Sequence, residues 1–253
     1  MWGFEQKVVV VTGGNRGIGR GIVEEFANAG ANVCFTYLNQ EESAKELEVQ
    51  YKGVTDIKVE GFCVDGRVES DVKAFVEQVL KQYGKIDVLV NNAAFISRRN
   101  FEDMNEEVWN KSIETNLNAT GYFCKYVLNS MKSHNAGAII NISTVCAEQP
   151  CRGQAAYSST KAAIEALSKV LALEYGPNHI RVNVVAPGFI MSGTPKQKHM
   201  TEEQVQNVED SIPLKRSGYP KDVANAVLFL ASEKASYITG DVIHITGGNH
   251  LKC

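Results

Sequence analysis

The sequence predicts an α/β protein built on a doubly wound, mostly parallel β-sheet with helices on both faces. Three observations lead to this prediction. Short continuous runs of β-branched residues recur along the chain, as expected of strands buried on both faces of a parallel sheet. Amphipathic segments long enough for crossover helices lie between these runs. A glycine-rich turn follows the first run directly, where Rossmann-like folds bind a nucleotide.

Seven runs are expected to form the strands of this sheet. They cover residues 7–12, 32–37, 57–64, 86–91, 138–142, 180–185 and 242–245. Helices are expected between them, for example over residues 41–51 and 71–83. No linker, repeat or low-complexity segment interrupts the alternation, so residues 1–253 are expected to form one domain. The least regular stretch, residues 192–213, is polar and is expected to form a substrate flap outside the sheet.

Composition and charge exclude several classes of partner. The chain has 253 residues, 44% of them hydrophobic, and a formal net charge of -3. That balance offers no basic surface for nucleic acid or for an anionic membrane. No apolar stretch is long enough to cross a bilayer, and the first residues lack the charged start and apolar centre of a signal peptide. A cytoplasmic location is therefore expected.

The cysteines are scattered, and no Cys-x-x-Cys pair or His-rich neighbourhood accompanies them. This distribution indicates neither a metal site nor a disulfide framework. Most of them are expected to be small core residues. The six positions are Cys34, Cys63, Cys124, Cys146, Cys151 and Cys253.

The turn after the first strand reads Thr-Gly-Gly-Asn-Arg-Gly-Ile-Gly over residues 12–19. Gly13, Gly17 and Gly19 permit a tight turn, and a helix beginning near Gly17 would direct its N-terminal amides at a pyrophosphate. The spacing Gly-x-x-x-Gly-x-Gly differs from the usual dinucleotide fingerprint. An ordinary tight turn between a strand and a helix is the alternative, but the position after strand one favours a nucleotide site.

Charge around the second strand favours NADP(H) over NAD(H). An NAD site usually carries an acid at the end of this strand, whereas a 2′-phosphate requires a cation there. The strand ends in Thr-Tyr-Leu-Asn over residues 36–39, and Arg16 in the glycine turn is the available cation. A solvated surface arginine is the alternative for Arg16. Asp65, after the third strand, is expected either to bind the adenine amine or to cap a helix.

Asparagines mark two further positions. Asn91 and Asn92 end the fourth strand, where buried amides are costly unless they form hydrogen bonds. Asn91 is expected to tie neighbouring strands together through hydrogen bonds. The alternative for the side-chain amides of this pair is to line the cofactor crevice. Asn116 falls within a helical stretch, where an isolated Asn is ordinarily a surface residue or a kink.

Tyr157 and Lys161 are the candidate acid/base pair. Their four-residue spacing stacks both side chains on one face of a helix. A fixed cation favours the phenolate, so Lys161 is expected to lower the pKa of Tyr157 from about 10. Tyr-x-x-x-Lys occurs readily by chance, so the pair gains weight only from the other motifs.

Together, these motifs resemble the short-chain dehydrogenase/reductase family across essentially the whole chain. The resemblance is carried by the glycine turn, Asn-Asn-Ala-Ala at 91–94, Asn116, Tyr-x-x-x-Lys and Pro187-Gly188. It implies that Tyr157 is the general acid/base and that Lys161 binds the nicotinamide ribose and lowers the tyrosine pKa. Asn116 would hold a water that links Lys161 to solvent.

The resemblance also implies a cofactor site. Ile190 would meet the nicotinamide carboxamide, with Ser192 near the diphosphate, and Arg16 matches an arginine that accompanies NADP use in the family. The family's Asn-Asn-Ala-Gly ends here in Ala94. The residues expected to bind cofactor are Gly13, Asn15, Arg16, Gly17, Ile18, Gly19, Tyr37, Asp65, Gly66, Asn92, Ala93, Ala94, Tyr157, Lys161, Gly188, Ile190 and Ser192.

The family's substrate-orienting serine lies thirteen residues before the tyrosine, and Thr144 occupies that position. A threonine hydroxyl donates the same hydrogen bond, although its methyl group narrows the pocket. Ser143 is the alternative, and it should point away from the site if the strand continues regularly through both residues. Catalysis is thus assigned to Asn116, Thr144, Tyr157 and Lys161.

The reaction implied by the resemblance is reduction of a ketone, or oxidation of a secondary alcohol, through NADP(H). An NADPH-dependent carbonyl reductase is the first reading. A sugar or hydroxysteroid dehydrogenase using NAD or NADP, and a non-catalytic NADP-binding sensor, are the alternatives. The resemblance to 3-oxoacyl-carrier-protein reductases is closest, but the positions of their docking arginines hold the neutral Asn135 and Asn178. The available cations nearby are Lys132, Arg152 and Arg181.

The resemblance also implies an oligomer. A homotetramer, or a homodimer, would use the helical stretches 108–131 and 154–175 and the C-terminal strand. The usual Val-Asp-Gly-Gly after that strand is replaced by Ile-Thr-Gly-Gly at 245–248. The substrate pocket is expected to take its walls from a mixed set of side chains, for which ordinary packing is the alternative: Phe95, Ile96, Cys146, Glu148, Phe189 and Met191.

Overall fold

The chain folds around one parallel sheet, as expected from the seven β-branched runs. The computed structural model describes residues 2–53, 56–193, 197 and 199–251. Its strands follow the order β3-β2-β1-β4-β5-β6-β7, and all neighbours pair in parallel. The strands are β1 (Val8–Val11), β2 (Asn32–Tyr37), β3 (Val59–Cys63), β4 (Val88–Asn91), β5 (Gly137–Ile142), β6 (Ile180–Pro187) and β7 (Val242–Ile245).

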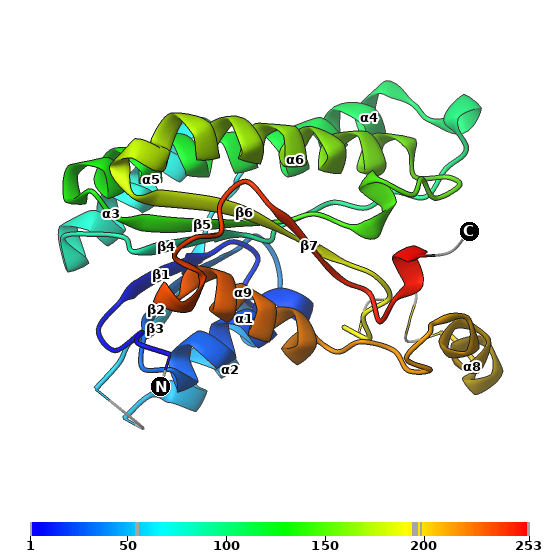
Figure 1. Ribbon diagram of the computed structural model, residues 1–253, viewed down its shortest axis with the longest axis horizontal. Helices are drawn as coiled ribbons and strands as arrows, with labels where there is room; N and C mark the ends of the chain where they lie inside the picture. The colour runs from blue at the N-terminus through cyan, green and yellow to red at the C-terminus, as the bar shows by residue number, and fades with distance from the viewer. Residues whose placement is uncertain (1, 54–55, 194–196, 198, 252–253) are drawn as a thin grey trace.

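Helices cover both faces of the sheet (Figure 1). One face carries α1 (Gly17–Asn28), α2 (Glu41–Tyr51) and α9 (Pro220–Ala231). The other carries α3 (Glu69–Tyr83), α5 (Ala119–His134) and α6 (Ala155–Tyr175). The helix expected over 41–51 is found with those bounds, and the one expected over 71–83 begins two residues earlier. The expected doubly wound architecture is confirmed.

The pleat of the strands divides the core into two apolar layers. Val9 and Val11 of β1 pack among the helices of one face, while Val8 and Val10 pack among those of the other. All four are at most 2% exposed. Burying one valine in this way contributes about 1.5 to 3 kcal/mol. A continuous apolar run is therefore stable here, because neither side of the strand faces water.

The order of strands reverses between β1 and β4. From β1 the chain winds outward through β2 to β3, then returns to β4 on the other side and continues to β7. Two crossovers consequently leave this point in opposite directions, and the carboxyl ends of β1 and β4 open onto a crevice. The glycine-rich turn and the Asn-Asn pair both lie at these strand ends.

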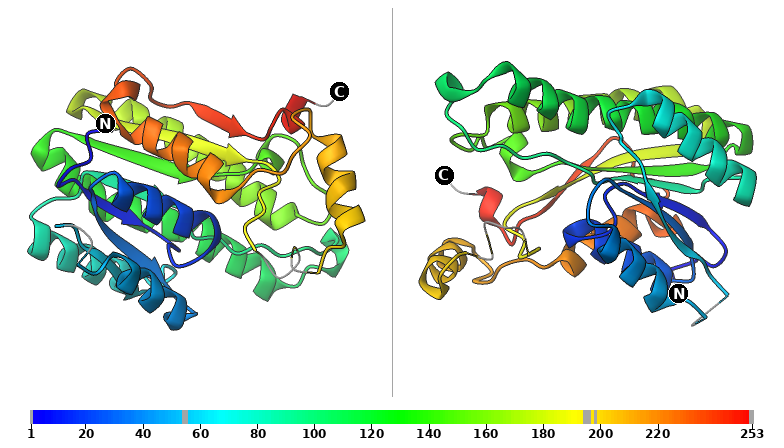
Figure 2. Two further views of the ribbon diagram at one scale, coloured as in Figure 1. Left: turned by 90° about the horizontal axis from the view of Figure 1, so that it is seen from below. Right: turned by 180° about the vertical axis from the view of Figure 1, so that it is seen from behind.

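The stretch expected as a flap contains α8 (Glu202–Ser211), which stands away from the sheet (Figures 1 and 2). A capping box holds its start, because Thr201 accepts from the Gln204 amide and the Gln204 side chain accepts from the Thr201 amide. An isolated parallel bridge between Ile190 and Gly218 ties the two ends of the excursion together. Residues 194–196 and 198, including Pro195, lie outside the described residues.

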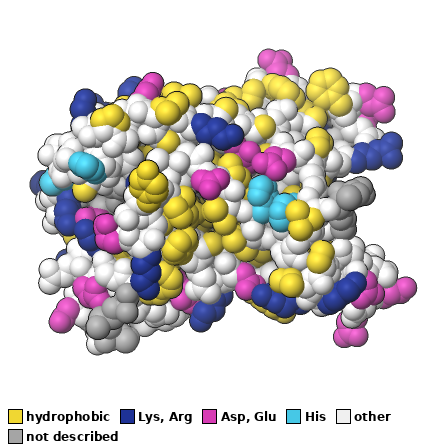
Figure 3. Space-filling view, viewed as in Figure 1, with side chains coloured by type: hydrophobic (Ala, Val, Ile, Leu, Met, Phe, Trp, Pro, Cys, Tyr) yellow, Lys and Arg dark blue, Asp and Glu magenta, His cyan; other side chains and the backbone are white. Residues whose placement is uncertain are grey.

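Neither sign of charge dominates the face of the molecule shown in Figure 3. Acidic and basic side chains are interspersed on the face in Figure 3, and hydrophobic side chains gather over the region of β7 and α9. Tyr237, which precedes β7, is fully exposed. Among the described residues, no helix is long and apolar enough to cross a membrane.

Candidate active site

The turn between β1 and α1 has a backbone that requires glycine. Gly13 and Gly17 have φ values of 64° and 55°, in the left-handed region that other residues rarely adopt. Gly19 is required for a different reason: a Cβ there would lie 2.1 Å from the carbonyl oxygen of Gly13. The turn is therefore as tight as its sequence predicted.

The turn is fastened to β4 by Thr12 and Asn92. The Thr12 hydroxyl oxygen accepts the amides of Asn92 and Ala93 at 2.9 and 3.0 Å. The Asn92 side chain donates to the carbonyls of Thr12 and Gly13 at 2.9 and 3.1 Å. Asn91 donates to Asn141 across β4 and β5 at 2.8 Å, so the expected strand-tying role of Asn91 is confirmed.

The N-terminus of α1 has the chemistry of a phosphate site. Its N-cap residue, Arg16, makes no side-chain capping bond, so the first amides of the helix remain available to an anion. The exposed Arg16 guanidinium forms no ion pair within the described part of the chain. Ser192 lies opposite, 3.5 Å from where a Cβ on Gly17 would stand. These groups fit a dinucleotide phosphate.

The ends of β2 and β3 lie beside the glycine turn. Asn15 donates its side-chain amide to the carbonyls of Asn39 and Gln40 at 2.9 and 3.1 Å, which fixes the loop after β2. Asp65 does not cap α3, whose N-cap is Val68. The helix-cap alternative is therefore wrong.

Asp65 is instead held by Arg67, a partner that the sequence analysis did not identify. The Arg67 guanidinium donates to both carboxylate oxygens, at 2.9 and 2.5 Å. Its hydrogen bonds hold the pKa of Asp65 below the ordinary value. Gly66 packs beside α5, where a Cβ would lie 3.2 Å from Ala119. Tyr37, the last residue of β2, is half-buried.

Tyr157, Thr144 and Lys161 converge at the carboxyl end of β5. Tyr157 and Lys161 lie in the first turns of α6, with 9% and 2% of their surface exposed. The Thr144 side chain lies close enough to Tyr157 to lower the pKa of its phenol. The Lys161 ammonium donates to the carbonyl of Ile142 at 2.6 Å and lies 5.8 Å from the centre of the Tyr157 ring. The expected pair therefore shares one face of the helix.

Ser143 points away from this group. Its hydroxyl donates to Glu165 at 2.5 Å inside the protein, whereas Thr144 contacts Tyr157. The expected alternation of side chains thus continues to the strand end. Glu165, one turn beyond Lys161, is a buried carboxylate that the sequence analysis did not single out. The sequence feature that could have identified Glu165 is its i, i+4 spacing from Lys161.

Burial controls the proton affinities in this group. It raises the pKa of Tyr157 to about 12, opposed by the hydrogen bond to Thr144 and the charge of Arg98. It lowers the pKa of Lys161 to about 8, opposed by the charge of Glu165. The expected lowering of the tyrosine pKa is therefore not observed, because desolvation of the phenolate outweighs the attraction of a lysine directed at Ile142.

We expect Lys161 to give a signature in stability against pH. Its folded pKa near 8 lies below its ordinary 10.5, so the unfolded chain binds more protons between these values and stability rises with pH. The rise should amount to roughly 2 to 3 kcal/mol relative to Lys161→Met. Urea unfolding at pH 7.5 to 10 measures it, below the range where Tyr157 acts in the opposite direction. Parallel curves for both proteins would contradict the assignment.

Asn116 occupies an irregular helical turn. The helix expected over 108–131 is divided into α4 (Glu106–Ser112), a π-helical segment (Ile113–Asn118) and α5. Such π turns occur frequently at functional sites. The fully buried Asn116 accepts from the Phe95 amide at 2.8 Å and donates to the Thr160 hydroxyl at 3.0 Å. It is therefore a structural junction between the segment after β4 and α6.

The segment after β6 completes the crevice. Ile190 is 5% exposed. Gly188 packs against Thr246, because a Cβ added to Gly188 would lie 3.1 Å from the Thr246 Cα. Gln197 donates to the Ile190 carbonyl at 2.6 Å and accepts the Ser192 amide at 3.0 Å. Gln197 thereby fixes the backbone that faces the glycine turn. Ile18 packs on the core, and Ala94 is exposed at the end of β4.

One sequence expectation about the cysteines is wrong. Cys146 and Cys151 form a disulfide, with their Cα atoms 5.5 Å apart. The spacing of these two cysteines does not predict a disulfide, because the pairing depends on a reversal of the chain between them. Cys34 and Cys124 are buried as expected, whereas Cys63 is exposed. Cys253 lies outside the described residues.

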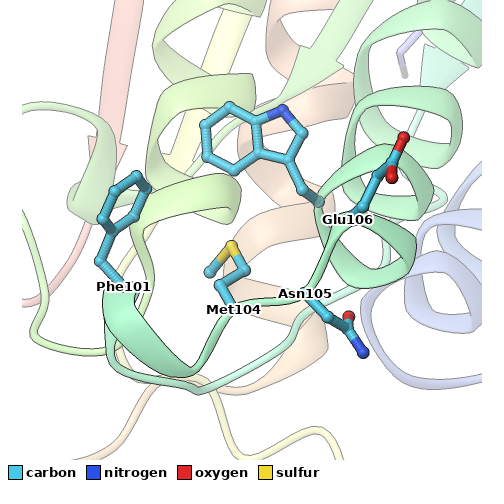
Figure 4. A pocket seen from close by; sticks show the side chains of 5 residues that line it. Phe101, Met104, Asn105 and Glu106 are labelled. Atoms are coloured by element: carbon cyan, nitrogen blue, oxygen red, sulfur yellow. The ribbon is translucent and has the colours of Figure 1, made fainter.

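One cavity lies away from this crevice. It has a volume of about 260 Å³ and is formed where the segment after β4 enters α4. Phe101 and Met104 turn to the same side of this segment, and Asn105 points away (Figure 4). None of its lining residues belongs to the candidate site. Over the described ranges, no cluster of three or more His, Cys, Asp or Glu side chains is arranged to hold a metal.

Comparisons with known proteins agree with this geometry. A family model described as enoyl-(acyl carrier protein) reductase matches residues 13–250. The 3-oxoacyl-acyl-carrier-protein reductase FabG of Chlamydia muridarum (strain MoPn / Nigg) is 40% identical over 242 residues, 96% of either chain. The acetoacetyl-CoA reductase of Acinetobacter sp. (strain RA3849) is 36% identical over 247 residues, 98% of this chain and 99% of that protein.

A solved structure extends the likeness to three dimensions. The aldohexose dehydrogenase of Thermoplasma acidophilum, in ligand-free form, has a TM-score of 0.86 and 31% identity, covering 99% of this chain and 96% of that one. The match of the family model, the whole-length relatives and the shared sheet agree with the ordered motifs of the sequence. This chain is therefore an oxidoreductase that belongs to the short-chain dehydrogenase/reductase family.

Proposed function

We propose that this protein reduces a ketone to a secondary alcohol with NADPH, and that the ketone is the 3-oxo group of a small acyl thioester. The observation that carries the proposal is the convergence of the Thr144 and Tyr157 hydroxyls beside the buried Lys161. Two whole-length relatives named for 3-oxoacyl and acetoacetyl substrates support the substrate class.

The chemistry divides between cofactor and protein. The nicotinamide supplies the hydride when it is bound. The Thr144 and Tyr157 hydroxyls donate hydrogen bonds to the carbonyl oxygen, which stabilise the negative charge that develops there. Tyr157 then delivers its proton to that oxygen as general acid. A tyrosine whose pKa burial raises to about 12 is fully protonated at neutral pH, which suits reduction as the working direction.

Lys161 and Asn116 have supporting roles in this proposal. Lys161 holds the end of β5 through the carbonyl of Ile142. Asn116 positions the backbone after β4 against α6 through Phe95 and Thr160. We propose that Lys161 also binds the nicotinamide ribose and that Asn116 connects it to solvent through water, so that Tyr157 is reprotonated after each turnover.

The preference for NADPH is supported by charge at the end of β2. The exposed residues 38–40 after this strand contain no acid, and the Arg16 guanidinium is not engaged in an ion pair within the described residues. A 2′-phosphate would complete such a site, whereas a ribose hydroxyl would leave the arginine without a partner. The remaining cofactor contacts are proposed at the crevice residues described above.

Arg16→Ala should weaken NADPH binding roughly ten- to hundredfold and leave NADH binding unchanged. A hydrogen bond to a charged group contributes about 1.5 to 3 kcal/mol, which corresponds to that range. Equilibrium titration of cofactor fluorescence measures both affinities. Arg20→Ala is the matched control, because Arg20 lies on the same helix but pairs with Glu24 at 2.9 Å. Equal weakening of NADPH and NADH by Arg16→Ala would argue against the 2′-phosphate contact.

The docking positions favour a coenzyme A thioester over a carrier protein. Asn135 and Asn178 are neutral, and Arg181 is committed to the carbonyls of Leu230 and Ser232 at 2.5 and 3.1 Å. Lys132 and Arg152 alone remain of the cations that the sequence offered. An acidic carrier would therefore meet a weak electrostatic surface.

A sugar dehydrogenase is the second candidate, and the aldohexose dehydrogenase structure is the observation that favours it. A substrate panel separates the two. Acetoacetyl-CoA, acetoacetyl carrier protein, glucose and a hydroxysteroid are each assayed with both cofactor pairs. We expect NADPH oxidation with acetoacetyl-CoA, and turnover confined to glucose with NAD would reject the proposal.

Three further properties belong to this proposal. We infer a cytoplasmic enzyme, and a homotetramer or homodimer in which the exposed apolar side chains of α6, Val170 and Leu173, and the region of β7 form contacts between subunits. We also infer one catalytic domain, in which residues 192–213 serve as the flap over the substrate. Small-angle scattering or sedimentation checks the oligomer directly.

A further inference from the structure

The disulfide lies within the short loop that separates two catalytic candidates. Residues 145–156, here called the bridged loop, connect Thr144 at the end of β5 to Tyr157 in α6. Cys146 and Cys151 close the first half of this loop, with their Cα atoms 5.5 Å apart. A bond at this place restricts the path of the chain between the two hydroxyls that would hold the substrate carbonyl.

The inner end of the bridge contacts the reaction site directly. The Cys146 amide donates to the Thr144 hydroxyl oxygen at 3.3 Å, so Thr144 caps the short helical turn that carries Cys146 (Val145–Ala147). Thr144 in turn lies beside Tyr157, whose pKa it lowers. The position of Cys146 therefore sets the orientation of the Thr144 hydroxyl.

The outer side of the bridged loop docks on the C-terminal segment. The Glu148 carboxylate lies 3.2 Å from Nε2 of His244 in β7, and Gln149 donates to the carbonyl of His250. The rings of His244 and His250 stack at 4.6 Å, and Thr246 is bonded to His250 at 2.6 Å. Both contacts come from residues that the bridge encloses. The bridge thus also holds the loop against the strand that ends the sheet.

The bridge differs from the other cysteines in accessibility. Cys151 is exposed while Cys146 is 7% exposed, so a thiol can reach one sulfur of the pair. Burial raises the pKa of the Cys34 and Cys124 thiols to about 12, which makes them unreactive. Cys63 is exposed but isolated from the bridge in sequence, at the end of β3.

We propose that Cys146 and Cys151 form a reversible redox site, and that thiol/disulfide exchange there sets the affinity for the carbonyl substrate. This inference rests on the proposed function for its effect on catalysis. Disulfides in the cytoplasm are usually transient and redox-sensing, which agrees with an exposed bridge beside an active site. The oxidised form binds substrate more tightly, because the loop and the Thr144 hydroxyl are ordered before the substrate arrives.

The electrons that reduce the disulfide come from a small thiol or a protein dithiol. One donor thiolate attacks the exposed Cys151 sulfur, the bond to Cys146 breaks, and a mixed disulfide forms while Cys146 leaves as a thiolate. A second donor thiol resolves the mixed disulfide. The site then holds two thiols, and the donor is released as its own disulfide. Oxidised glutathione reverses the sequence.

The test compares fully oxidised and fully reduced protein, with the redox state verified by the mass of alkylated peptides. We expect reduction to raise the KM for acetoacetyl-CoA roughly three- to tenfold, the cost of ordering one or two side chains. The dissociation constant for NADPH should stay within about twofold, because the glycine turn is fastened to β4 through Thr12 and Asn92 and not through the bridged loop. Reoxidation should restore the KM.

Cysteine variants test whether the change in KM depends on the Cys146–Cys151 disulfide. Cys151→Ser, at the exposed position, should have the KM of the reduced protein under both conditions, whereas Cys63→Ser should keep the full response. A response that survives in Cys151→Ser, or an unchanged KM in the reduced parent, overturns the inference.

Hydrogen exchange of the bridged loop separates this inference from the proposed function. Amides of residues 145–156 should exchange at least tenfold faster after reduction, and this result does not depend on any substrate. If neither redox state reduces acetoacetyl-CoA, the proposed substrate fails while accelerated exchange still supports the redox site. Unchanged exchange overturns the redox site whatever the substrate is.

Discussion

Replacing Tyr157 by Phe should lower kcat roughly a hundred- to ten-thousandfold while NADPH binds as before. The substitution removes only the hydroxyl that would give its proton to the carbonyl oxygen, and general acid catalysis of this kind contributes that factor. The ring stays buried, so the fold should be preserved. Stopped-flow measurement of NADPH oxidation gives kcat, and titration of cofactor fluorescence gives the dissociation constant.

Thr144→Ser and Thr144→Ala provide the comparison for this result. Serine keeps the hydroxyl that lies beside Tyr157 and should retain most of the activity, whereas alanine should lose activity because one hydrogen bond to the carbonyl oxygen is missing. Ser143→Ala should leave kcat nearly unchanged, because that hydroxyl faces Glu165. A Tyr157→Phe enzyme with strong residual turnover would remove Tyr157 from its role.

Gly19→Ala should weaken NADPH binding roughly ten- to hundredfold. The added Cβ would stand 2.1 Å from the Gly13 carbonyl and 2.5 Å from the Asn92 amide nitrogen, so the turn must open. Forcing one extra methyl into such a contact costs about 1 to 3 kcal/mol. The loss should affect NADH equally, which distinguishes it from the Arg16→Ala result. Isothermal titration with both cofactors measures it.

Gly121→Ala is the matched control for this substitution. Gly121 lies inside α5, and a Cβ there meets no atom within 4 Å. Alanine in a helix is more stable than glycine by about 1 kcal/mol, so this variant should melt slightly higher and bind NADPH normally. If Gly19→Ala behaved in the same way, the tight packing of the turn would have no role in cofactor binding.

Much of the fold was predictable because its determinants are local. A run such as that of β1 is apolar on both faces, and this pattern occurs only where layers cover both sides of a strand. The division between Ser143 and Thr144 followed from the alternation of a strand in the same way. Glycines 13, 17 and 19 were identifiable because their backbone requirements are those of a tight turn.

Other features depend on contacts between distant segments. The bond between Ser143 and Glu165 joins β5 to α6, and the pKa of Tyr157 depends on how completely the assembled protein excludes water. The disulfide required the path of the bridged loop. The pair of Asp65 and Arg67 was local, and its charge pattern was available in the sequence.

The pairing of β1 with β4 also determines the order in which the chain can fold. Val9 lies beside Val33 on one side and beside Val88 on the other. During synthesis, β1 can join β2 and β3 early, but its second edge stays open until β4 has left the ribosome. Contacts between residues so distant in sequence form slowly. The apolar strands of the nucleotide-binding half are therefore exposed to aggregation for that interval, and a chaperone that shields them would raise the yield of folded enzyme.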